Sequence, residues 1–146
     1  MIYTKMTKEA MKIAFKAHVK QVDKAGIPYI YHPIYVAEKM NDEDSTIVAL
    51  LHDVIEDTNI TINNLKDIGF NEKIVEALKI LTHDKNDDYY TYINKISTND
   101  IATKVKIVDL EHNMKIERLN KITLEDLERV KKYKKCQDFL KKKIQF

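Results

Sequence analysis

Apolar residues recur at intervals of three and four along nearly the whole chain, and this helical spacing is what most constrains the fold. No long stretch alternates between apolar and polar residues, as a half-buried strand requires. Only two glycines and two prolines occur in 146 residues, and no segment has the composition of a linker or a repeat. We therefore expect an all-α protein, a compact single-domain bundle of seven or eight helices over residues 1–146.

Helix boundaries follow from capping residues and helix breakers. Gly69 is expected to stop one helix, and the segment 87–97 is expected to form another. Pro33 suits a first helical turn, which places His32 at the cap of that helix. A longer helix is expected over residues 99–119. The expected caps or first residues, in chain order, are Thr7, Pro33, Asp44 or Ser45, Thr61, Asn71, Asn99 and Thr123.

The charge balance gives no indication of a polyanionic partner. With 25 basic and 23 acidic residues, the net charge of +2 is too small to indicate a nucleic-acid binder. The N-terminal segment lacks the apolar region of a signal peptide, and no apolar run is long enough to cross a bilayer. The single cysteine, Cys136, cannot form an internal disulfide, which suits a reducing compartment. We expect a cytoplasmic protein without nucleic-acid or membrane partners, and its oligomeric state stays open.

Four side chains able to bind metals or transfer protons follow directly on five apolar residues in the stretch IVALLHDVIED. They are His52, Asp53, Glu56 and Asp57. On a helix these four positions project from one side. Burying so many carboxylates near a helix C-terminus is unfavourable, because they lose hydration and meet the negative end of the helix dipole. Two interpretations are open at this point: an acidic helix tip in solvent, or a bound cation.

Two further polar residues stand in the same kind of apolar, helix-periodic surroundings. His32 lies in the segment HPIYVAEKM, and Asp109 lies in VKIVDLEHNM. Two imidazoles together with carboxylates from separate helices form the ligand set that a borderline divalent metal prefers. These two residues favour the interpretation with a bound cation.

The order of these residues resembles that of the HD superfamily of metal-dependent phosphohydrolases. The segments AHVKQVDKAGIPYIYHPIYVAEKM, ALLHDVIEDT and VKIVDLEHNM are similar to the hydrolase domain of Rel/SpoT-type alarmone enzymes and their small stand-alone relatives. The similarity runs from about Met6 to Leu140. It implies an HD-type helical bundle that hydrolyses a phosphorylated nucleotide.

The resemblance also implies one divalent metal ion, bound by His32, His52, Asp53 and Asp109. Neutral imidazole nitrogens and carboxylate oxygens suit manganese, iron, cobalt, nickel or zinc. Among these we expect Mn²⁺. Four protein ligands leave open positions on a six-coordinate ion for an oxygen of a substrate phosphate.

Glu56 and Asp57 lie one helical turn beyond two of the expected ligands. The resemblance favours them, Glu56 in particular, as general acid/base residues. Alternatively, both carboxylates accept hydrogen bonds from the metal-binding imidazoles and thereby orient those rings.

Three residues from distant parts of the chain are expected to bind the substrate. Lys24 aligns with a basic position that the resemblance places against the nucleotide, and Asn113 belongs to the family's Asp-x-x-His-Asn pattern. Tyr133 resembles a tyrosine that closes the nucleotide pocket, although packing in the apolar stripe of the last helix explains it equally well. His112, in the same pattern as Asn113, either packs within the bundle or contacts the ligand.

The chain departs from the family at Asp23 and Leu110, two positions where the alarmone enzymes carry arginine. A carboxylate beside a phosphate-binding loop repels the substrate, accepts hydrogen bonds from a less charged ligand, or pairs with Lys24. We therefore expect a substrate with less phosphate near this loop, or a nucleotide base that is held differently, than in the alarmone enzymes. On this basis Asp23→Arg is expected to raise kcat/KM for guanosine tetraphosphate about tenfold.

The leading functional prediction is a metal-dependent phosphohydrolase most like the guanosine-3′,5′-bis(diphosphate) 3′-pyrophosphohydrolases, with a small nucleotide as substrate. The nearest alternative is a nucleotidase or other phosphomonoesterase that uses the same site. A non-catalytic nucleotide sensor is a third possibility, although every metal and acid/base position is filled.

Overall fold

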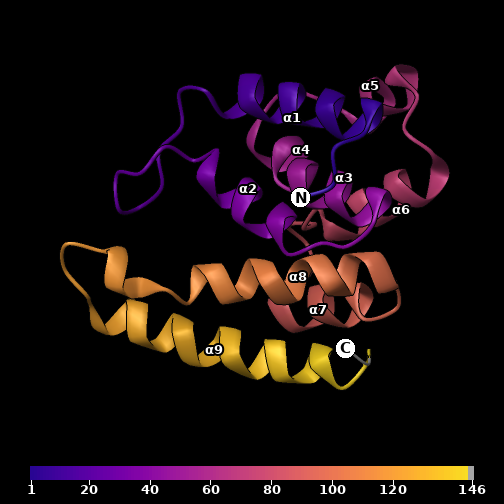
Figure 1. Ribbon diagram of the computed structural model, residues 1–146. Coiled ribbons are helices and arrows are strands. Elements are labelled where there is room, and N and C mark those ends of the chain that lie inside the picture. Colours follow the sequence, from indigo (N-terminus) through magenta and orange to yellow (C-terminus); the bar gives the residue numbers. More distant parts are fainter. Residues whose placement is uncertain (145–146) are drawn as a thin grey trace.

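The computed structural model describes residues 1–144, and within that range the secondary structure is helical except for one isolated β-bridge between Val22 and Pro28. Residues 145 and 146, the last two of the expected domain, lie outside the described residues. Eight helices have seven or more residues and α4 is a single turn, so the all-α prediction and its helix count are confirmed for residues 1–144. The elements, labelled in Figure 1, are α1 (Lys5–His18), α2 (Tyr31–Glu38), α3 (Glu43–Leu51), α4 (Val54–Asp57), α5 (Ile62–Ile68), α6 (Glu72–Leu81), α7 (Tyr89–Ile96), α8 (Asp100–Asn113), the 3₁₀ helix η1 (Ile116–Arg118) and α9 (Leu124–Lys141).

Capping residues set most helix boundaries where the sequence predicts them. The side chains of four predicted caps accept a hydrogen bond from a backbone N–H in the first turn of α5, α6, α8 and α9, namely Thr61, Asn71, Asn99 and Thr123. Gly69 follows α5 with a φ of +109°, a left-handed conformation that favours glycine.

The N-terminal boundaries of α1 and α3 differ from the prediction. The cap of α1 is Thr4, because its Oγ1 accepts from the Thr7 backbone N–H at 3.1 Å while Thr7 Oγ1 accepts from the Thr4 N–H at 2.7 Å. Thr7 is therefore the reciprocal partner in a capping box. The cap of α3 is Asp42 rather than the expected Asp44 or Ser45, since its Oδ1 accepts from the Ser45 N–H at 2.8 Å.

The long helix expected over 99–119 is also shorter than predicted. α8 ends at Asn113, and Lys115 leaves the helical conformation with a ψ of 72°. The short 3₁₀ helix η1 follows, so the chain changes direction before α9 begins. This change places the segment 115–119 beside a cavity described below.

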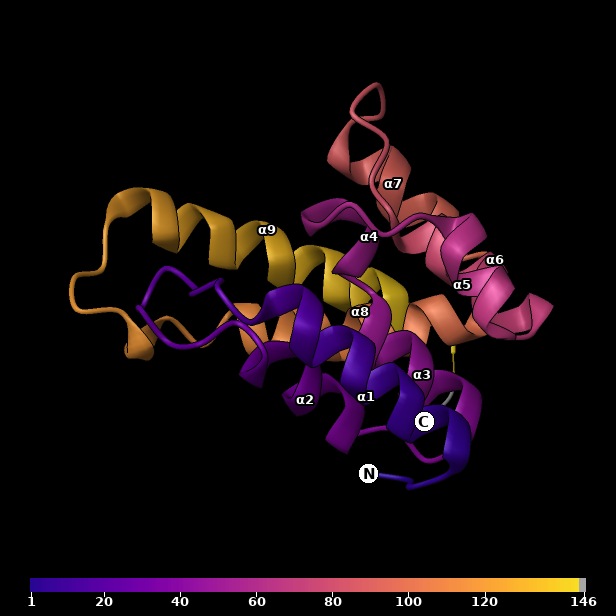
Figure 2. The same cartoon turned by 90° about the horizontal axis from the view of Figure 1, so that it is seen from above.

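α3 lies at the centre of the bundle. All seven residues from Ser45 to Leu51 are buried, and α1, α2, α6 and α8 pack around this helix. Figure 1 shows α8 between α2 and α9, which packs on the opposite side of α8, and Figure 2 shows the same helices from above. A helix that is apolar on nearly all sides needs such enclosure. The C-terminal end of α3, where the His-Asp pair stands, is therefore held inside the protein.

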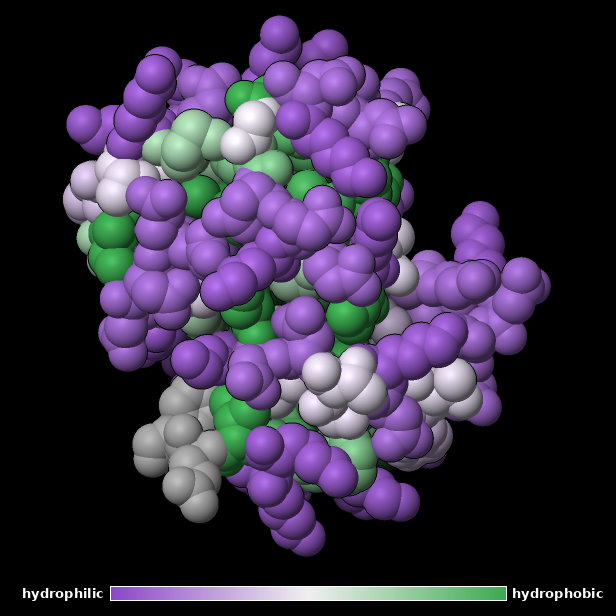
Figure 3. All heavy atoms as spheres, turned by 90° about the vertical axis from the view of Figure 1, so that its right-hand side faces the viewer, coloured by the Kyte–Doolittle hydropathy of each residue, from purple (hydrophilic) through white to green (hydrophobic). Residues whose placement is uncertain are grey.

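One face of the protein is largely polar. Figure 3 shows a face on which hydrophilic side chains predominate, with scattered apolar patches between them. Scattered apolar residues are normal on the surface of a folded protein. Within residues 1–144, no helix is both long enough and apolar enough to span a bilayer.

Candidate metal centre and adjoining pocket

The His52–Asp53 pair marks a break between two helices. α3 ends at Leu51, His52 is its C-cap, and Asp53 is the N-cap of the single turn α4. The expectation that both side chains lie on one continuous helix is therefore wrong. The break directs them to the same point, since His52 Nε2 lies 3.1 Å from Asp53 Oδ2.

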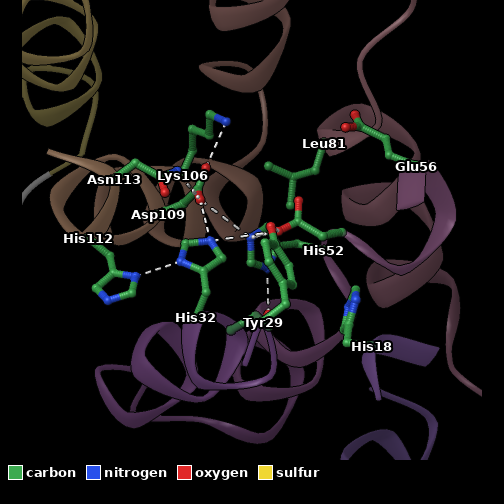
Figure 4. Close-up of polar contacts among 12 residues, drawn as sticks. His18, Tyr29, His32, His52, Glu56, Leu81, Lys106, Asp109, His112 and Asn113 are labelled. Atoms are coloured by element: carbon green, nitrogen blue, oxygen red, sulfur yellow. Dashed lines mark hydrogen bonds and ion pairs between the residues drawn. The ribbon is translucent and has the colours of Figure 1, made fainter. Parts of the chain in front are cut away.

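Other helices bring two more side chains to this point. His32 lies in the first turn of α2, one residue after its start at Tyr31 rather than at the cap. Its Nε2 is 2.8 Å from Oδ1 of Asp109, in α8, and 3.6 Å from Asp53 Oδ2. His52 Nε2 is 3.5 Å from Asp109 Oδ1. The structure thus brings three of the four predicted metal ligands, His32, His52 and Asp109, into one group that could hold an ion, and it places Asp53 beside both imidazoles. Figure 4 shows the two imidazoles beside Asp109.

The hydrogen bonds of His52 suit a cation at this point. Its Nδ1 lies 2.6 Å from the Ala49 carbonyl oxygen, which can only accept, so Nδ1 carries a proton. Nε2 is then the nitrogen left to bind a cation or a second proton. This buried Nε2 makes no well-aligned hydrogen bond within the described part of the chain, although carboxylate oxygens of Asp53 and Asp109 lie 3.1 and 3.5 Å away. Buried polar atoms rarely stay unpaired, so the ligand atoms present fit a metal ion.

The charges around His52 point in the same direction. Burial alone lowers the pKa of His52, but the carboxylates of Asp53 and Asp109 outweigh burial and raise this pKa well above its usual value. The centre therefore requires positive charge at Nε2. A proton or a divalent cation can supply that charge, and a cation would displace the proton.

His112 lies beside His32 and helps to orient it. Their Nδ1 atoms are 2.7 Å apart and the rings stack. Burial, followed by the neighbouring His32, lowers the pKa of His112 to about 4. A neutral His112 can accept the Nδ1 proton of His32, which leaves Nε2 of His32 free to bind a metal. Tyr35 stacks on the His112 ring at 4.2 Å, so the structure favours packing within the bundle for His112.

Lys106 supplies positive charge behind Asp109. Its Nζ lies 2.8 Å from Asp109 Oδ2 and 5.1 Å from the centre of the Tyr92 ring. Burial opposes ionisation of Asp109, but the Lys106 ammonium and the two nearby imidazoles hold the pKa of Asp109 well below its usual range. Lys106 is not among the residues that the sequence predicts for this site. Its i,i+3 spacing from Asp109, which places both side chains on one helix face, is the signal that could have found it.

Tyr29 fixes the other carboxylate of the centre. Its hydroxyl donates to Asp53 Oδ2 at 2.6 Å, and its ring packs 5.0 Å from that of His18. Burial, followed by the charge of Asp53, raises the pKa of Tyr29 above its ordinary value. Tyr29 therefore stays protonated and keeps donating to Asp53 over the whole working pH range.

Glu56 and Asp57 share α4, and both side chains are exposed. Glu56 is exposed, and one of its carboxylate oxygens accepts a hydrogen bond from the His83 backbone N–H, in the loop after α6. Figure 4 accordingly shows Glu56 apart from the imidazole rings. Although Asp57 is exposed, partial desolvation by the neighbouring protein atoms, followed by repulsion from Asp53 and Glu56, raises its pKa to about 6. The acid/base roles of both residues stay predictions.

A cavity of about 320 Å³ adjoins the metal centre. Tyr29 and Asn113 line it and connect it to the centre, because Tyr29 donates to Asp53 and Asn113 Nδ2 donates to Asp109 Oδ1 at 3.0 Å. The lining also contains four cationic side chains, Lys24, Lys115, Arg118 and Arg129. All three residues predicted to bind the substrate therefore meet in one cavity: Lys24, Asn113 and Tyr133.

Asp23 also lines this cavity, and its charge is already paired. Asp23 Oδ2 accepts from Arg118 Nη1 at 2.7 Å, and Oδ1 accepts from the N–H groups of Ala25 and Ile27 at 2.8 and 3.0 Å. The pairing with Lys24 considered above is therefore wrong. Because the guanidinium neutralises the carboxylate and Asp23→Arg would remove three hydrogen bonds, we withdraw the tenfold gain expected for that substitution.

The chain is similar in sequence to alarmone enzymes. It is 32% identical over 126 residues to the bifunctional (p)ppGpp synthase/hydrolase SpoT of Escherichia coli K12, which covers 76% of the chain and 18% of the relative. The chain is an HD-type domain similar to the Rel/SpoT hydrolase domain. Guanosine-3′,5′-bis(diphosphate) 3′-pyrophosphohydrolases of Borreliella burgdorferi and Aquifex aeolicus match this HD-type domain with 35% and 38% identity, over 73% and 50% of the chain.

These curated relatives are much longer than the match, since the HD-type domain spans 18% of the Borreliella enzyme and 11% of the Aquifex enzyme. No family model matches the chain. Among solved structures, a metazoan ortholog of SpoT, described as hydrolysing ppGpp, superimposes with a TM-score of 0.77 at 22% identity. The alignment covers 99% of this chain and 88% of that one. The predicted HD-type fold is therefore confirmed.

Proposed function

We propose that this chain is a metal-dependent phosphohydrolase that cleaves guanosine 3′,5′-bis(diphosphate) to GDP and pyrophosphate. The observation that carries the proposal is the convergence of two imidazoles and two carboxylates beside a cationic cavity. The carboxylates suit a divalent cation, and the cavity suits a phosphorylated ligand. The names of the curated relatives support the same reaction.

His32, His52, Asp53 and Asp109 are the proposed ligands of one divalent ion, with Mn²⁺ as the proposed metal. Such an ion, when bound, neutralises charge on a phosphoryl oxygen and lowers the pKa of a water molecule. The chain itself fixes the ligands: the Ala49 carbonyl orients His52, and Tyr29 orients Asp53. Rigid ligands of this kind keep the reacting groups aligned.

Glu56 and Asp57 are the proposed proton-transfer residues, one accepting a proton from the attacking water and one supplying a proton to the leaving group. Both lie in the single turn that directly follows the metal ligand Asp53. Lys24, Asn113 and Tyr133 are the proposed contacts to the nucleotide, since all three line the adjoining cavity. With a net charge of only +2, we propose a free nucleotide as substrate, no nucleic-acid or membrane partner, and a cytoplasmic location.

The proposal is tested by incubating Mn²⁺-loaded protein with guanosine 3′,5′-bis(diphosphate), nucleoside monophosphates and dinucleotide cofactors, and by identifying the products by anion-exchange chromatography. We expect GDP and pyrophosphate from the first substrate. Release of orthophosphate from monophosphates would favour the phosphomonoesterase. Tight nucleotide binding without any product would favour the sensor.

A further inference from the structure

The cavity beside the metal centre is lined by both free and carboxylate-paired cationic side chains. Four cationic side chains line it, and Asp23 is its one carboxylate among the described residues. Two of these cations differ from the lysines because carboxylates fix them: Asp23 holds Arg118 at 2.7 Å, and Asp126 holds Arg129 at 2.6 Å. A fixed guanidinium binds an anion with less loss of side-chain entropy than a free lysine does.

Arg118 is held by two separate hydrogen bonds. Its Nε donates to the Lys115 carbonyl at 3.0 Å, and its Nη1 donates to Asp23 Oδ2 at 2.7 Å. No hydrogen bond to the described residues uses Nη2, and 27% of the side chain is exposed. The guanidinium is therefore oriented by the protein and still has N–H groups to offer to a ligand.

Asp23 in turn is fixed by the loop that carries Lys24. Its Oδ1 accepts from the N–H groups of Ala25 and Ile27, and the loop is closed by a backbone hydrogen bond from the Asp23 N–H to the Ile27 carbonyl oxygen. One carboxylate thus ties η1 to the loop 22–28, across 95 residues of sequence. The ion pair between Asp23 and Arg118 therefore joins two of the segments that line the cavity, the loop 22–28 and η1.

We propose that Arg118, positioned by Asp23, is a specificity-determining residue that binds a phosphate group on the nucleotide remote from the bond that is cleaved. The site then selects nucleotides that carry phosphate on both sides of the ribose. This inference rests on the proposed function, because it assumes that a nucleotide occupies the cavity. It reverses the expectation from sequence that Asp23 selects a less phosphorylated ligand.

The test compares the affinities of GDP and guanosine by titration calorimetry, since the two differ only in the remote diphosphate. We expect wild-type protein to bind GDP more tightly, and Arg118→Gln to lower GDP affinity about tenfold while guanosine affinity stays unchanged. Unchanged guanosine affinity also shows that the variant is folded. Asp23→Asn, which keeps the Oδ1 acceptor, is expected to lower GDP affinity by about threefold. Lys121→Gln, an equal loss of charge at an exposed residue outside the cavity lining, is the matched control.

An unchanged ratio of GDP to guanosine affinity in Arg118→Gln would overturn the role of Arg118. If wild-type protein nevertheless hydrolysed guanosine 3′,5′-bis(diphosphate), the proposed function would stand and only the role of Arg118 would be wrong. Wild-type protein that neither binds GDP nor hydrolyses the bis(diphosphate) would overturn both. An equal loss of GDP affinity in Lys121→Gln would show that GDP affinity depends on the net charge of the protein and not on Arg118, which also contradicts the proposal.

Discussion

Glu56 is the residue at which proton transfer can best be separated from structure. Its carboxylate oxygen accepts from the His83 backbone N–H, and the amide of glutamine can accept the same hydrogen bond. We therefore expect Glu56→Gln to keep the fold and the metal, yet to lose about 100-fold to 10,000-fold in kcat. Steady-state kinetics beside metal analysis check this, with the exposed Glu76→Gln as control. A loss below about threefold would exclude Glu56 from the chemical step.

Asp57 gives the reaction a pH dependence. Partial desolvation and the carboxylates of Asp53 and Glu56 raise the pKa of Asp57 to about 6, so this group takes up a proton as the pH falls through that value. If Asp57 acts as the base, kcat falls below about pH 6 in wild-type protein. We expect Asp57→Asn to lower kcat and to remove this transition from the pH profile. A transition at the same pH in the variant would assign it to another group.

The metal ligands could be predicted because each one belongs to an extended local motif that is visible in the sequence. Their supports could not be predicted in the same way. Tyr29 reaches Asp53 across 24 residues, and Asp23 reaches Arg118 across 95. Such pairs depend on how the helices pack, which no local pattern records. Leu110, the second departure from the family, is buried in the core.

At the scale of helices, the N-terminus of α9 depends on a reciprocal capping box. Asp126 Oδ2 accepts from the Thr123 backbone N–H, and Arg129 pairs with Oδ1. These hydrogen bonds, the one from Thr123 first, lower the pKa of Asp126 to about 2. Because the folded-state pKa lies below the ordinary value, Asp126 stabilises the fold above about pH 4 and loses this contribution as the pH falls towards 2.

We therefore expect wild-type protein to lose more stability between pH 4 and pH 2 than Asp126→Asn, which cannot titrate. Urea unfolding followed by circular dichroism at several pH values measures the difference. Parallel curves for the two proteins would show that Asp126 does not contribute to acid sensitivity.

Helix starts were easier to predict than helix ends and breaks, for a physical reason. A cap such as Thr61 or Thr123 bonds to its own first turn, so sequence alone displays it. The end of α8 at Asn113 is not displayed, because Ile116 and Leu119 continue the helical spacing of apolar residues. The break at His52 is hidden in the same way within IVALLHDVIED.

At the scale of the whole molecule, the metal centre joins α2, α8 and the α3–α4 junction, so a bound ion should stabilise the entire fold. At a hundredfold excess over Kd, a ligand of the native state contributes about 2.7 kcal/mol, or about 5 to 10 °C in Tm. We expect Mn²⁺ to raise the Tm of wild-type protein by this amount and to leave the Tm of Asp109→Ala unchanged. Equal shifts in both proteins would place the ion elsewhere.

The central claim is that the His-Asp centre releases pyrophosphate from a guanosine nucleotide. Its most direct test is the rate of pyrophosphate formation from guanosine 3′,5′-bis(diphosphate) in Mn²⁺, for wild-type protein and for Asp109→Asn. Asp100→Asn, the same substitution at an exposed position of α8, is the control. We predict equimolar GDP and pyrophosphate from wild-type and control proteins and a loss of at least about 100-fold in Asp109→Asn. Absence of pyrophosphate from the wild-type reaction, or equal rates in all three proteins, would contradict the claim.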